Sequence, residues 1–517
     1  MKKRQIVNII NFIRACEPRE EVDLVESVRE QLRLMREHAL PGTFLLQYDA
    51  LLREDIVTLL KQEACGDFEY GVWLEIVEPQ VRAAGIPWRG RFAWDWHANT
   101  GFSVGYTPKE RERLIALLFE KFWEIFGYYP KSMGSWIIDA HSLRFASERY
   151  GIVASCNCKD QWGTDGYTLW GAYYNQAYYP AKNNAFCPAG TKEGQIGVPV
   201  FRMLGSDPIY QYDMGLDVGT GAVKVQGVVT LEPVYAGTTG GGGVPEWVDW
   251  YLKENFNEKC LAFSYTQAGQ ENSFGWRRMK DGLIDQFEKL ARLRDAGTVA
   301  VEPLCESGRW FQDSFPLTPA TTMVTESDWA NNGKQSVWYN CRRYRANLLC
   351  EGNEFRLRDL YLFDENYRER YLEEVCTSHV LQYDNLPVID GNRFSGHGVL
   401  AGLFAACGGE RLHFDGMVYE ELSADTAKVT LTNTQIGDFV IVFSPNTLTF
   451  FCGADFALLE IHDPQAEGVP ACLVEEKNLS FVHRGFPYAV RLSCGRAVQE
   501  GWGYRIDSVQ GRVVLEF

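Results

Sequence analysis

The sequence predicts an α/β protein in which a (β/α) barrel of seven or eight strands precedes a small C-terminal antiparallel β-sandwich. Segments that suit buried strands alternate with segments of helical periodicity over about the first 300 residues, which is typical of a parallel α/β fold. The 517 residues are enough for one large domain and a smaller one. From about residue 406 onward, short segments with alternating apolar residues favour a sandwich. A doubly wound open sheet is the alternative to the barrel.

The elements of the predicted barrel follow one another in order. Residues 5–14 suit a first strand, residues 22–38 carry apolar side chains at helical spacing, and residues 43–49 suit a second strand that ends in an acid. Residues 68–76 suit a third strand, and the Thr-Pro pair at 107–108 is typical of a helix start. Later strands are expected at 135–138, 152–155, 197–202, 260–265 and 299–302, and a later helix at 277–293.

Two stretches of the predicted barrel, residues 156–193 and 203–245, have little periodicity. In a barrel such insertions usually build the pocket, and decoration or an oligomer contact is the alternative. The second stretch contains Gly240–Gly243, and because no Lys-Ser/Thr pair follows, we expect a flexible loop rather than a phosphate site. The chain then divides into a barrel with long loop insertions (1–330), a segment that completes or connects the barrel (331–405) and the sandwich (406–517).

Composition limits the partners and the compartment. The formal net charge of −17 argues against a nucleic acid or an anionic membrane surface as partner. The 15 Trp and 25 Tyr supply flat aromatic faces, which suit a glycan or oligosaccharide ligand, and a homodimer is compatible with the sequence. No apolar run approaches a membrane span, and asparagines interrupt the run at 5–13. The 14 cysteines form no CxxC pair, so we expect free thiols and a cytoplasmic protein.

An acid and a histidine follow the strand predicted at 135–138. Residues just past the carboxyl end of a parallel strand line the ligand site of α/β folds, so Asp139 and His141 are candidates for that site. A neighbouring carboxylate can hold a histidine protonated, which would suit it to donate a proton. The structural alternative is that Asp139 caps the next helix and His141 packs under a loop.

The order of several motifs resembles a known superfamily. Thr43-Phe-Leu-Leu, Trp94-Asp-Trp-His97 and Phe126-Gly-Tyr-Tyr-Pro-Lys131, followed by Ser135-Trp-Ile-Ile-Asp139, resemble the barrel of polysaccharide deacetylases and the related glycoside hydrolases. The resemblance covers about residues 5–155. Metal-dependent members of that superfamily carry an acidic pair after the first strand and two histidines four residues apart. Neither is present here: the first strand leads into Arg14-Ala-Cys-Glu17, and Gly101 stands four residues after His97. We therefore expect no metal and no cofactor.

The same constellation is similar to the inverting exo-sialidase family, whose barrel enzymes pair a histidine acid with an aspartate base. That resemblance implies His141 as the acid and a base after the first strand, where this chain has Glu17; Asp139 is the other candidate base. A sialic acid carries a carboxylate, which Arg14 or Arg202 would hold; ion pairs with nearby acids are the alternative role of these arginines.

The leading hypothesis from the sequence is a metal-independent, exo-acting, inverting glycoside hydrolase, with sialosides as the specific substrate. The second is a metal-dependent carbohydrate deacetylase that uses Asp49, Asp95 and His97, and the third is a sugar-binding protein without catalysis. Glu271 is one of several further acids at predicted strand ends. The expected substrate contacts are Arg14, Asp49, Asp95, His97, Arg202, Asp207, Tyr212, Asn340 and Arg343.

Overall fold

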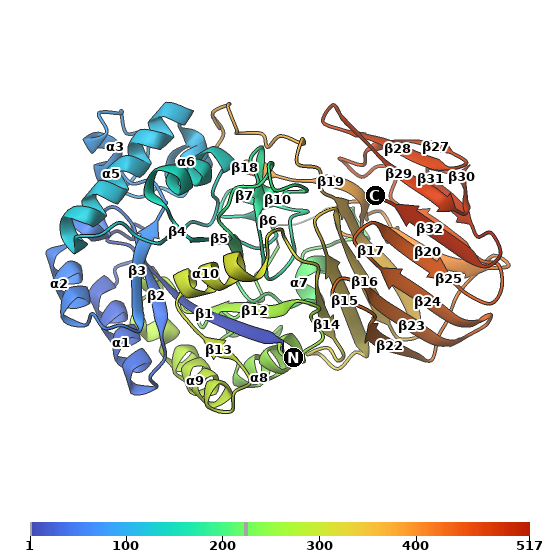
Figure 1. Cartoon of the computed structure of the whole chain (residues 1–517), viewed down its shortest axis with the longest axis horizontal. Coiled ribbons are helices and arrows are strands. Elements are labelled where there is room, and N and C mark those ends of the chain that lie inside the picture. The colour runs from blue at the N-terminus through green and yellow to red at the C-terminus, as the bar shows by residue number, and fades with distance from the viewer. Residues whose placement is uncertain (1–2, 222–225) are drawn as a thin grey trace.

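The chain is a mixed α/β protein with a curled parallel sheet at one end and antiparallel sheets at the other (Figure 1). The computed structural model describes residues 3–221 and 226–517. Within these residues, no helix combines the length and the apolar composition that crossing a bilayer requires. The predicted cytoplasmic location stays a prediction.

The parallel sheet has the strand order β12-β1-β2-β3-β4-β5-β11-β8, with β13 also paired to β1. Its parallel strands are β1 (Arg4–Ile13), β2 (Gly42–Leu46), β3 (Phe68–Trp73), β4 (Ser132–Gly134), β5 (Ala154–Cys158), β11 (Val200–Met203), β12 (Phe263–Ala268) and β13 (Ala300–Val301). The short strand β8 (Ala177–Tyr178) runs antiparallel to β11 at one edge. The sheet curls into a half-barrel, so the parallel α/β prediction is confirmed and the closed barrel is only approximated.

Strand β1 pairs with three other strands, β12, β13 and β2. Its residues 4–9 pair with β12, and its residues 10–13 pair with β2. Every residue from Gln5 to Ile13 is buried. A parallel strand buried on both faces is almost continuously apolar, which explains why residues 5–14 are recognisable as a strand from the sequence.

The strand predicted at 135–138 lies elsewhere. The strand that pairs between β3 and β5 is the three-residue β4, which ends at Gly134. A Cβ at Gly134 would lie 2.6 Å from both Cys156 Sγ and Leu45 Cδ1, so only a glycine allows this close packing. The apolar residues that follow, among them Trp136, are buried beyond the end of the strand. The apolar run therefore marks the core beyond the strand end and not the strand itself.

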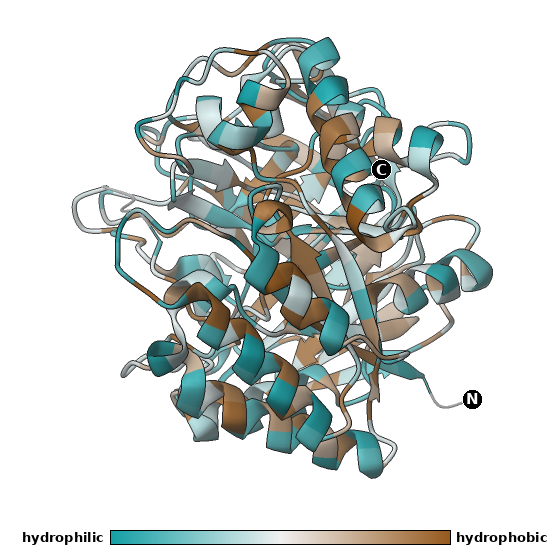
Figure 2. Ribbon diagram, turned by 90° about the vertical axis from the view of Figure 1, so that its left-hand side faces the viewer, coloured by the Kyte–Doolittle hydropathy of each residue, from teal (hydrophilic) through white to brown (hydrophobic). Residues whose placement is uncertain are grey.

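The chain contains helices, most of which cover the outside of the half-barrel, and those that face the viewer in Figure 2 carry both hydrophilic and hydrophobic residues. They are α1 (Leu24–Glu37), α2 (Glu54–Gln62), α3 (Glu78–Ala83), α4 (Ala98–Gly101), α5 (Pro108–Phe126), α6 (Ala140–Tyr150), α7 (Tyr210–Asp213), α8 (Pro245–Asn255), α9 (Trp276–Asp295) and α10 (Leu304–Ser314), with 3₁₀ turns η1 (Ala50–Leu52), η2 (Ser103–Gly105) and η3 (Asn272–Phe274). The predicted start of α5 is confirmed: Thr107 and Glu110 form a capping box, and Pro108 is the first helical residue.

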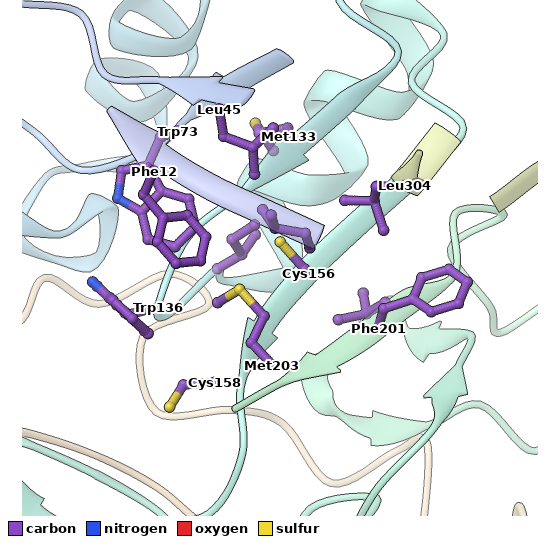
Figure 3. Close-up of a cluster of buried hydrophobic side chains, with 14 of the residues drawn as sticks. Phe12, Leu45, Trp73, Met133, Trp136, Cys156, Cys158, Phe201, Met203 and Leu304 are labelled. Atoms are coloured by element: carbon purple, nitrogen blue, oxygen red, sulfur yellow. The ribbon is translucent and has the colours of Figure 1, made fainter. Parts of the chain in front are cut away.

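The interior of the half-barrel is filled by aromatic and sulfur-containing side chains (Figure 3). The ring of Phe12 lies 4.3 Å from that of Trp73 and 5.3 Å from that of Trp136, measured between centroids. Cys156 and Cys158 are buried in the same cluster, and all fourteen cysteines are free thiols. Burial raises the pKa of Cys156 well above its ordinary value, which makes it a packing residue rather than a nucleophile.

The insertion after β5 forms short strands rather than an unstructured loop. They are β6 (Gln161–Thr164), β7 (Tyr167–Leu169), β9 (Pro180–Ala181) and β10 (Asn184–Pro188). Strands β6 and β7 form a hairpin that is joined by β18 (Leu381–Tyr383) from the C-terminal half of the chain. The insertion therefore connects the half-barrel to the antiparallel sheets.

Two large antiparallel sheets form the other end of the molecule. The ten-stranded sheet contains β14 (Thr321–Thr325), β15 (Lys334–Asn340), β16 (Tyr344–Glu351), β17 (Glu354–Leu362), β19 (Leu386–Asp390), β20 (Gly402–Cys407), β21 (Glu410–Arg411), β26 (Ala457–Ile461), β30 (Arg496–Glu500) and β31 (Gly503–Asp507). The eight-stranded sheet contains β22 (Gly416–Glu421), β23 (Ala427–Thr434), β24 (Gly437–Phe443), β25 (Thr447–Phe451), β27 (Ala471–Glu475), β28 (Asn478–His483), β29 (Phe486–Cys494) and β32 (Arg512–Glu516).

One hydrophobic cluster takes side chains from both antiparallel sheets, such as Tyr339 and Leu348 from one and Val429 and Leu515 from the other. Residues 331–405, which we assigned as a connecting segment, supply strands of the ten-stranded sheet. The antiparallel strands thus begin before residue 406. The sandwich over 406–517 and the boundaries at 330 and 405 stay predictions.

Candidate active site

A pocket that opens to solvent lies at the carboxyl ends of the parallel strands. Arg14 directly follows β1, Glu75 follows β3, Leu204 directly follows β11, and Glu271 follows β12. Because the carboxyl ends of parallel strands meet at one edge of the sheet, residues far apart in sequence converge here. The remaining lining residues are Arg19, Trp94, Trp96, Phe102, Trp136, Gln161, Thr164, Asp165, Tyr167, Val228, Glu232, Tyr235 and Phe274.

The guanidinium group of Arg14 joins two buried carboxylates in this cavity. Oε2 of Glu75 accepts hydrogen bonds from Nε and Nη2 of Arg14 at 3.1 and 2.9 Å, and from Trp73 Nε1 at 2.8 Å. The same Nη2 lies 3.1 Å from Oε2 of Glu271. Arg14, Glu75 and Glu271 are each at most 4% exposed. The two carboxylates and one guanidinium therefore form a nearly dry cluster with one surplus negative charge.

The backbone also holds Arg14 against the segment that carries Glu271. Asn272 Oδ1 accepts the Arg14 backbone N–H at 2.8 Å, and Asn272 Nδ2 donates to the Arg14 carbonyl at 2.9 Å. Oε1 of Glu271 accepts a hydrogen bond from Ser273 Oγ at 2.8 Å. These contacts fix the ends of β1 and β12 relative to each other, so the charged cluster is positioned by backbone as well as by side chains.

Burial and charge shift the pKa values in this cluster. Burial raises the pKa of Glu75, with the charge of Glu271 acting in the same direction and Arg14 opposing it. The pKa of Arg14 is raised, because the charges of Glu271 and Glu75 outweigh the cost of burying the guanidinium. Arg14 therefore stays charged at every pH at which the protein is folded.

Glu232 is a further buried carboxyl group in the cavity and is 7% exposed. Its oxygens accept hydrogen bonds from Thr230 Oγ1 at 2.9 Å and from Gln270 Nε2 at 3.3 Å. Burial raises its pKa to about 7, the charges of Glu271 and Asp165 act in the same direction, and the two hydrogen bonds oppose them. Unlike Glu75 and Glu271, it has no arginine partner among the described residues. Glu232 can therefore hold a proton at neutral pH.

The segment that carries Glu232 is tightly held, although it contributes no regular helix or strand. Gln286 Nε2 of α9 donates to the carbonyls of Leu231 and Gly242, at 2.8 and 2.7 Å. A Cβ at Gly242 would lie 2.2 Å from the Leu231 carbonyl oxygen. The Gly240–Gly243 run, expected to be a flexible loop, is instead a place where two backbone segments touch.

Aromatic rings form the walls of the cavity around the charged cluster. The guanidinium of Arg14 lies 4.0 Å from the ring centroid of Trp94, and that of Arg19 lies 5.0 Å from the same ring. Trp96, Trp136 and Tyr167 are further walls. Flat apolar faces beside hydrogen-bonding acids suit a ligand with both C–H and hydroxyl surfaces.

Comparisons with known proteins identify the fold. No model of a known protein family matches this sequence, and no curated protein matches it either. Among solved structures, a candidate glycoside hydrolase/deacetylase from Parabacteroides distasonis is similar, with a TM-score of 0.55 and 17% identity over 74% of this chain and 90% of that chain. At this identity the likeness shows the fold alone. The chain has a glycoside hydrolase/deacetylase-like fold.

Two further solved structures give lower scores. A candidate polysaccharide deacetylase from Mycobacterium smegmatis has a TM-score of 0.36 and 12% identity over 62% of this chain and 94% of that chain. Another from Pseudomonas aeruginosa PAO1 has a TM-score of 0.37 and 13% identity over 61% and 93%. These scores are too low to support an argument about this chain.

His141 and Asp139 lie outside the cavity. His141 is in the first turn of α6, and its Nε2 atom lies 3.1 Å from Oε1 of Glu112 on α5. Asp139 caps α6, is fully buried, and lies 3.1 Å from Nη1 of Arg111. The charge of Arg111 and hydrogen bonds from Ser103 and Ser142 outweigh burial and lower the pKa of Asp139. Asp139 therefore stabilises the junction of α5 and α6, and His141 faces Glu112 rather than the cavity.

Glu17 and Asp95 lie beside the cavity, and each of them forms an ion pair with an arginine. Glu17 accepts hydrogen bonds from Nε and Nη2 of Arg19 at 2.8 and 2.7 Å. Asp95 pairs with Arg91 at 2.8 Å, and the hydrogen bonds from Arg91 outweigh burial and lower its pKa to about 2. Both carboxylates are thus ionised and already paired at neutral pH.

His97 and Asp49 are placed by local contacts. The ring of His97 stacks on that of His379 with centroids 3.9 Å apart, and burial lowers its pKa. Asp49 accepts backbone hydrogen bonds from Ala50 and Ala15, at 2.8 and 3.3 Å, and burial raises its pKa to about 6. Asp49 therefore ties the segment after β1 to the segment after β2.

A metal ion held by the predicted set Asp49, Asp95 and His97 does not fit the geometry. The described residues contain no group of three or more His, Cys, Asp or Glu side chains that could hold a metal ion. Asp95 Oδ1 lies 3.7 Å from His97 Nδ1, but Asp49 is engaged by backbone N–H groups elsewhere. These three side chains therefore do not converge on a common metal position.

The other predicted contacts lie where the barrel loops meet the ten-stranded sheet. Arg202 is fully buried and pairs with Asp160 at 3.0 Å. The Tyr212 hydroxyl donates to the Arg358 carbonyl at 3.1 Å, and Asn340 Oδ1 accepts the Tyr174 backbone N–H at 2.9 Å. The two that remain are Asp207, which accepts the N–H groups of Ile209 and Tyr210 at 2.8 Å, and Arg343, which donates to the Phe517 carbonyl at 3.3 Å.

Of the residues singled out from the sequence, Arg14 and Glu271 line the cavity, which also contains Glu75 and Glu232, two acids that the sequence analysis does not identify. The predicted strand at 68–76 includes Glu75. In the structure β3 ends at Trp73, so Glu75 lies beyond the end of the strand and lines the cavity. An acid near the end of an apolar strand was the available signal. Glu232 lies in a stretch without periodicity, where no sequence signal places a side chain.

Proposed function

We propose that the protein is a carbohydrate-active hydrolase whose cavity binds a sugar unit and in which Glu232 donates a proton to the leaving group. The observation that carries this proposal is the contrast between Glu232 and Glu271. Both are buried in one cavity, but burial without an arginine partner raises the pKa of Glu232 to about 7, whereas Glu271 is ion-paired with Arg14. Carboxyl groups in environments that separate their protonation states are the usual acid and base of a glycosidase.

In the proposed reaction, the proton of Glu232 goes to the glycosidic oxygen as the bond between that oxygen and the anomeric carbon breaks. A water molecule supplies the new C–O bond, and its proton goes to Glu271. Glu75 accepts three hydrogen bonds on one oxygen, two from Arg14 and one from Trp73. Glu75 is therefore a positioning residue that orients Arg14, and Glu271 is the base.

The charge of the cavity favours a neutral or cationic sugar over a sialoside. Arg14 is shared between two glutamates, and Arg19 is paired with Glu17. Neither guanidinium is free to bind a sugar carboxylate, and Arg202 is paired with Asp160 away from the cavity. The surplus of carboxylates instead suits the positive charge that develops on the ring of a sugar as its glycosidic bond breaks. The sialoside substrate expected from sequence has no support in this geometry.

Deacetylation of a carbohydrate is the second candidate reaction. The fold likeness favours it, because the Parabacteroides protein at a TM-score of 0.55 carries a description that names both a glycoside hydrolase and a deacetylase. In this reaction Glu271 would activate water for attack on the acetyl carbonyl, and Glu232 would protonate the departing amine or alcohol. Glu271 and Glu232 would serve either reaction. The products distinguish the reactions, because glycoside hydrolysis releases a sugar and deacetylation releases acetate.

The test is to incubate the protein with a panel of aryl glycosides and of N- and O-acetylated sugars, and to measure released aryl alcohol, reducing sugar and acetate. We expect product from the wild type and a loss of about 10²-fold or more in Glu232→Gln and Glu271→Gln. Glu476→Gln is the matched control, since Glu476 is an exposed acid on the eight-stranded sheet with 64% side-chain exposure. Activity of both cavity variants equal to that of the control would overturn the proposal.

A further inference from the structure

A second cavity lies on the other side of the β6–β7 hairpin from the candidate active site. Gln161, Thr164 and Tyr167 of this hairpin line the active-site cavity, whereas Trp162 lines the second one. The second cavity has a volume of about 650 Å³ and is bounded by the hairpin, by residues 370–384 and by loops of both antiparallel sheets. It contains none of the residues used in the proposed reaction.

Three arginines, Arg370, Arg393 and Arg484, line this cavity. Asp384 is already engaged, because it pairs with Arg370 at 2.5 Å and lies 3.2 Å from His483 Nε2. A second acid, Asp463, lies 2.7 Å from Nδ1 of His397. Glu467, the third acid, is exposed at the rim. The three guanidinium groups are therefore the permanently cationic groups of the cavity, and only Arg370 forms an ion pair with one of its acids.

Arg393 and Arg484 make no ion pair within residues 3–221 and 226–517. Burial opposes the charge of Arg393, but Tyr361, Asp390 and Asp384 outweigh it and raise the pKa of this arginine. The guanidinium of Arg393 lies 4.5 Å from the ring centroid of Trp162, and its buried Nε has no hydrogen-bond partner in the described structure. The Nε of Arg370 is also buried without a partner. A buried N–H donor without an acceptor costs free energy, which a ligand oxygen in the cavity would recover.

The backbone keeps space open beside Arg393. A Cβ at Gly468 would lie 3.1 Å from Nη2 of Arg393, and Gly468 has a φ of +82°, which L side chains rarely adopt. A larger residue at this position would crowd the guanidinium. The glycine therefore leaves room beside Nη2 of Arg393.

We propose that this second cavity binds an oxyanion carried by a sugar, either a carboxylate or a sulfate ester, between Arg393, Arg370 and Arg484. The planar guanidinium forks match the geometry of a carboxylate or sulfate, and the Trp162 ring supplies an apolar face for sugar C–H groups. Because the hairpin β6–β7 contributes to both cavities, a ligand held here contacts the element that forms one wall of the active site. The site does not depend on which bond the active site breaks.

The test is calorimetric titration of the full chain at low salt with glucuronate, glucose 6-sulfate, inorganic sulfate and glucose as separate probes. We expect the two acidic sugars to bind and glucose not to bind. The dissociation constants should rise about tenfold or more in Arg393→Gln and in Arg484→Gln, and with added salt. Arg484 is exposed, so that variant keeps its fold even if Arg393→Gln does not. Arg491→Gln is the control, because Arg491 is 75% exposed on β29 and away from the cavity.

The probes also separate the two sources of the oxyanion and test the role of the sugar. Stronger binding of glucuronate than of glucose 6-sulfate would assign a carboxylate, and the reverse would assign a sulfate ester. Inorganic sulfate that binds as tightly as both sugars would overturn the part of the proposal that assigns a sugar to the Trp162 face. Equal affinities in Arg393→Gln, Arg484→Gln and Arg491→Gln, or no binding of either acidic sugar by the wild type, would overturn the site.

Discussion

Replacement of Glu232 by glutamine tests the proposed acid through stability as well as activity. Glutamine keeps the shape of the side chain, and its single oxygen can accept the hydrogen bond from either Thr230 or Gln270, which bond different oxygens of Glu232. Loss of the other bond changes the stability by an amount that does not depend on pH. Glutamine cannot be ionised. The wild-type protein must bury a carboxylate at this position at high pH, whereas the variant never does, so the difference in stability between the two depends on pH.

The sign and size of this difference follow from the pKa of Glu232. Burial raises the pKa from 4.5 to about 7. Between these two pH values the folded wild type binds more protons than the unfolded chain, so its free energy of unfolding falls as the pH rises and levels off above about pH 7. A shift of this size corresponds to about 3 kcal/mol. The variant lacks this loss and should gain about 3 kcal/mol relative to wild type between pH 4.5 and pH 8.

Thermal unfolding measures this gain. For a chain of this length unfolding as one unit, about 3 kcal/mol corresponds to a shift of the Tm of about 3 °C. The Tm of Glu232→Gln minus that of wild type should therefore increase by about 3 °C from pH 4.5 to pH 8, while activity falls by about 10²-fold or more relative to wild type below pH 7. Wild-type activity should itself decline as the pH rises through about 7, because the acid loses its proton. A pH-independent Tm difference would refute the assigned ionisation of Glu232, whatever the activity does.

Four further outcomes follow from the same geometry. Arg14→Lys keeps the charge but loses the fork that reaches both Glu75 and Glu271, so kcat/KM should fall by about 10²-fold. Asp139→Asn leaves Arg111 buried without its anion and should cost about 3–5 kcal/mol by chemical denaturation. His141→Ala removes a contact at the helix surface and should change kcat/KM by less than about twofold; a large loss would restore the histidine as the acid. Dialysis against a chelator should leave turnover unchanged, since the described residues form no metal-ligand group, and loss of turnover that added metal restores would favour metal-dependent deacetylation.

The sequence predicts the half-barrel well where burial produces a clear pattern. Strand β1 is buried on both faces, so the apolar run at 5–14 identifies it, and the Thr107–Pro108 start of α5 follows from capping chemistry. The apolar pattern of the sequence does not identify strand β4. This strand contains only three residues and ends in a glycine that its neighbours require, whereas the more apolar residues after it belong to the core beyond the strand.

The candidate site is less predictable from the sequence, because the role of each charged side chain depends on ion-pair partners that are far away in the sequence. Arg14 has the position of a carboxylate-binding residue, but Glu75 and Glu271 neutralise it, and no local pattern contains that information. Asp139 has the position of a catalytic base, yet Arg111 of the preceding helix holds it in the core. In both cases the pairing is a property of the folded chain and not of the motif.

Glu232 shows why the acid in particular is hidden from the sequence. A carboxyl group that must hold a proton near neutral pH needs burial without a cationic partner. Burial of this kind comes here from the insertion between β11 and β12, which α9 anchors through Gln286 to the carbonyls of Leu231 and Gly242. A change that loosens this anchor, such as Gln286→Ala, would admit water to Glu232 and lower its pKa toward the ordinary value. The reactivity of the cavity thus depends on a helix that supplies no residue to its lining.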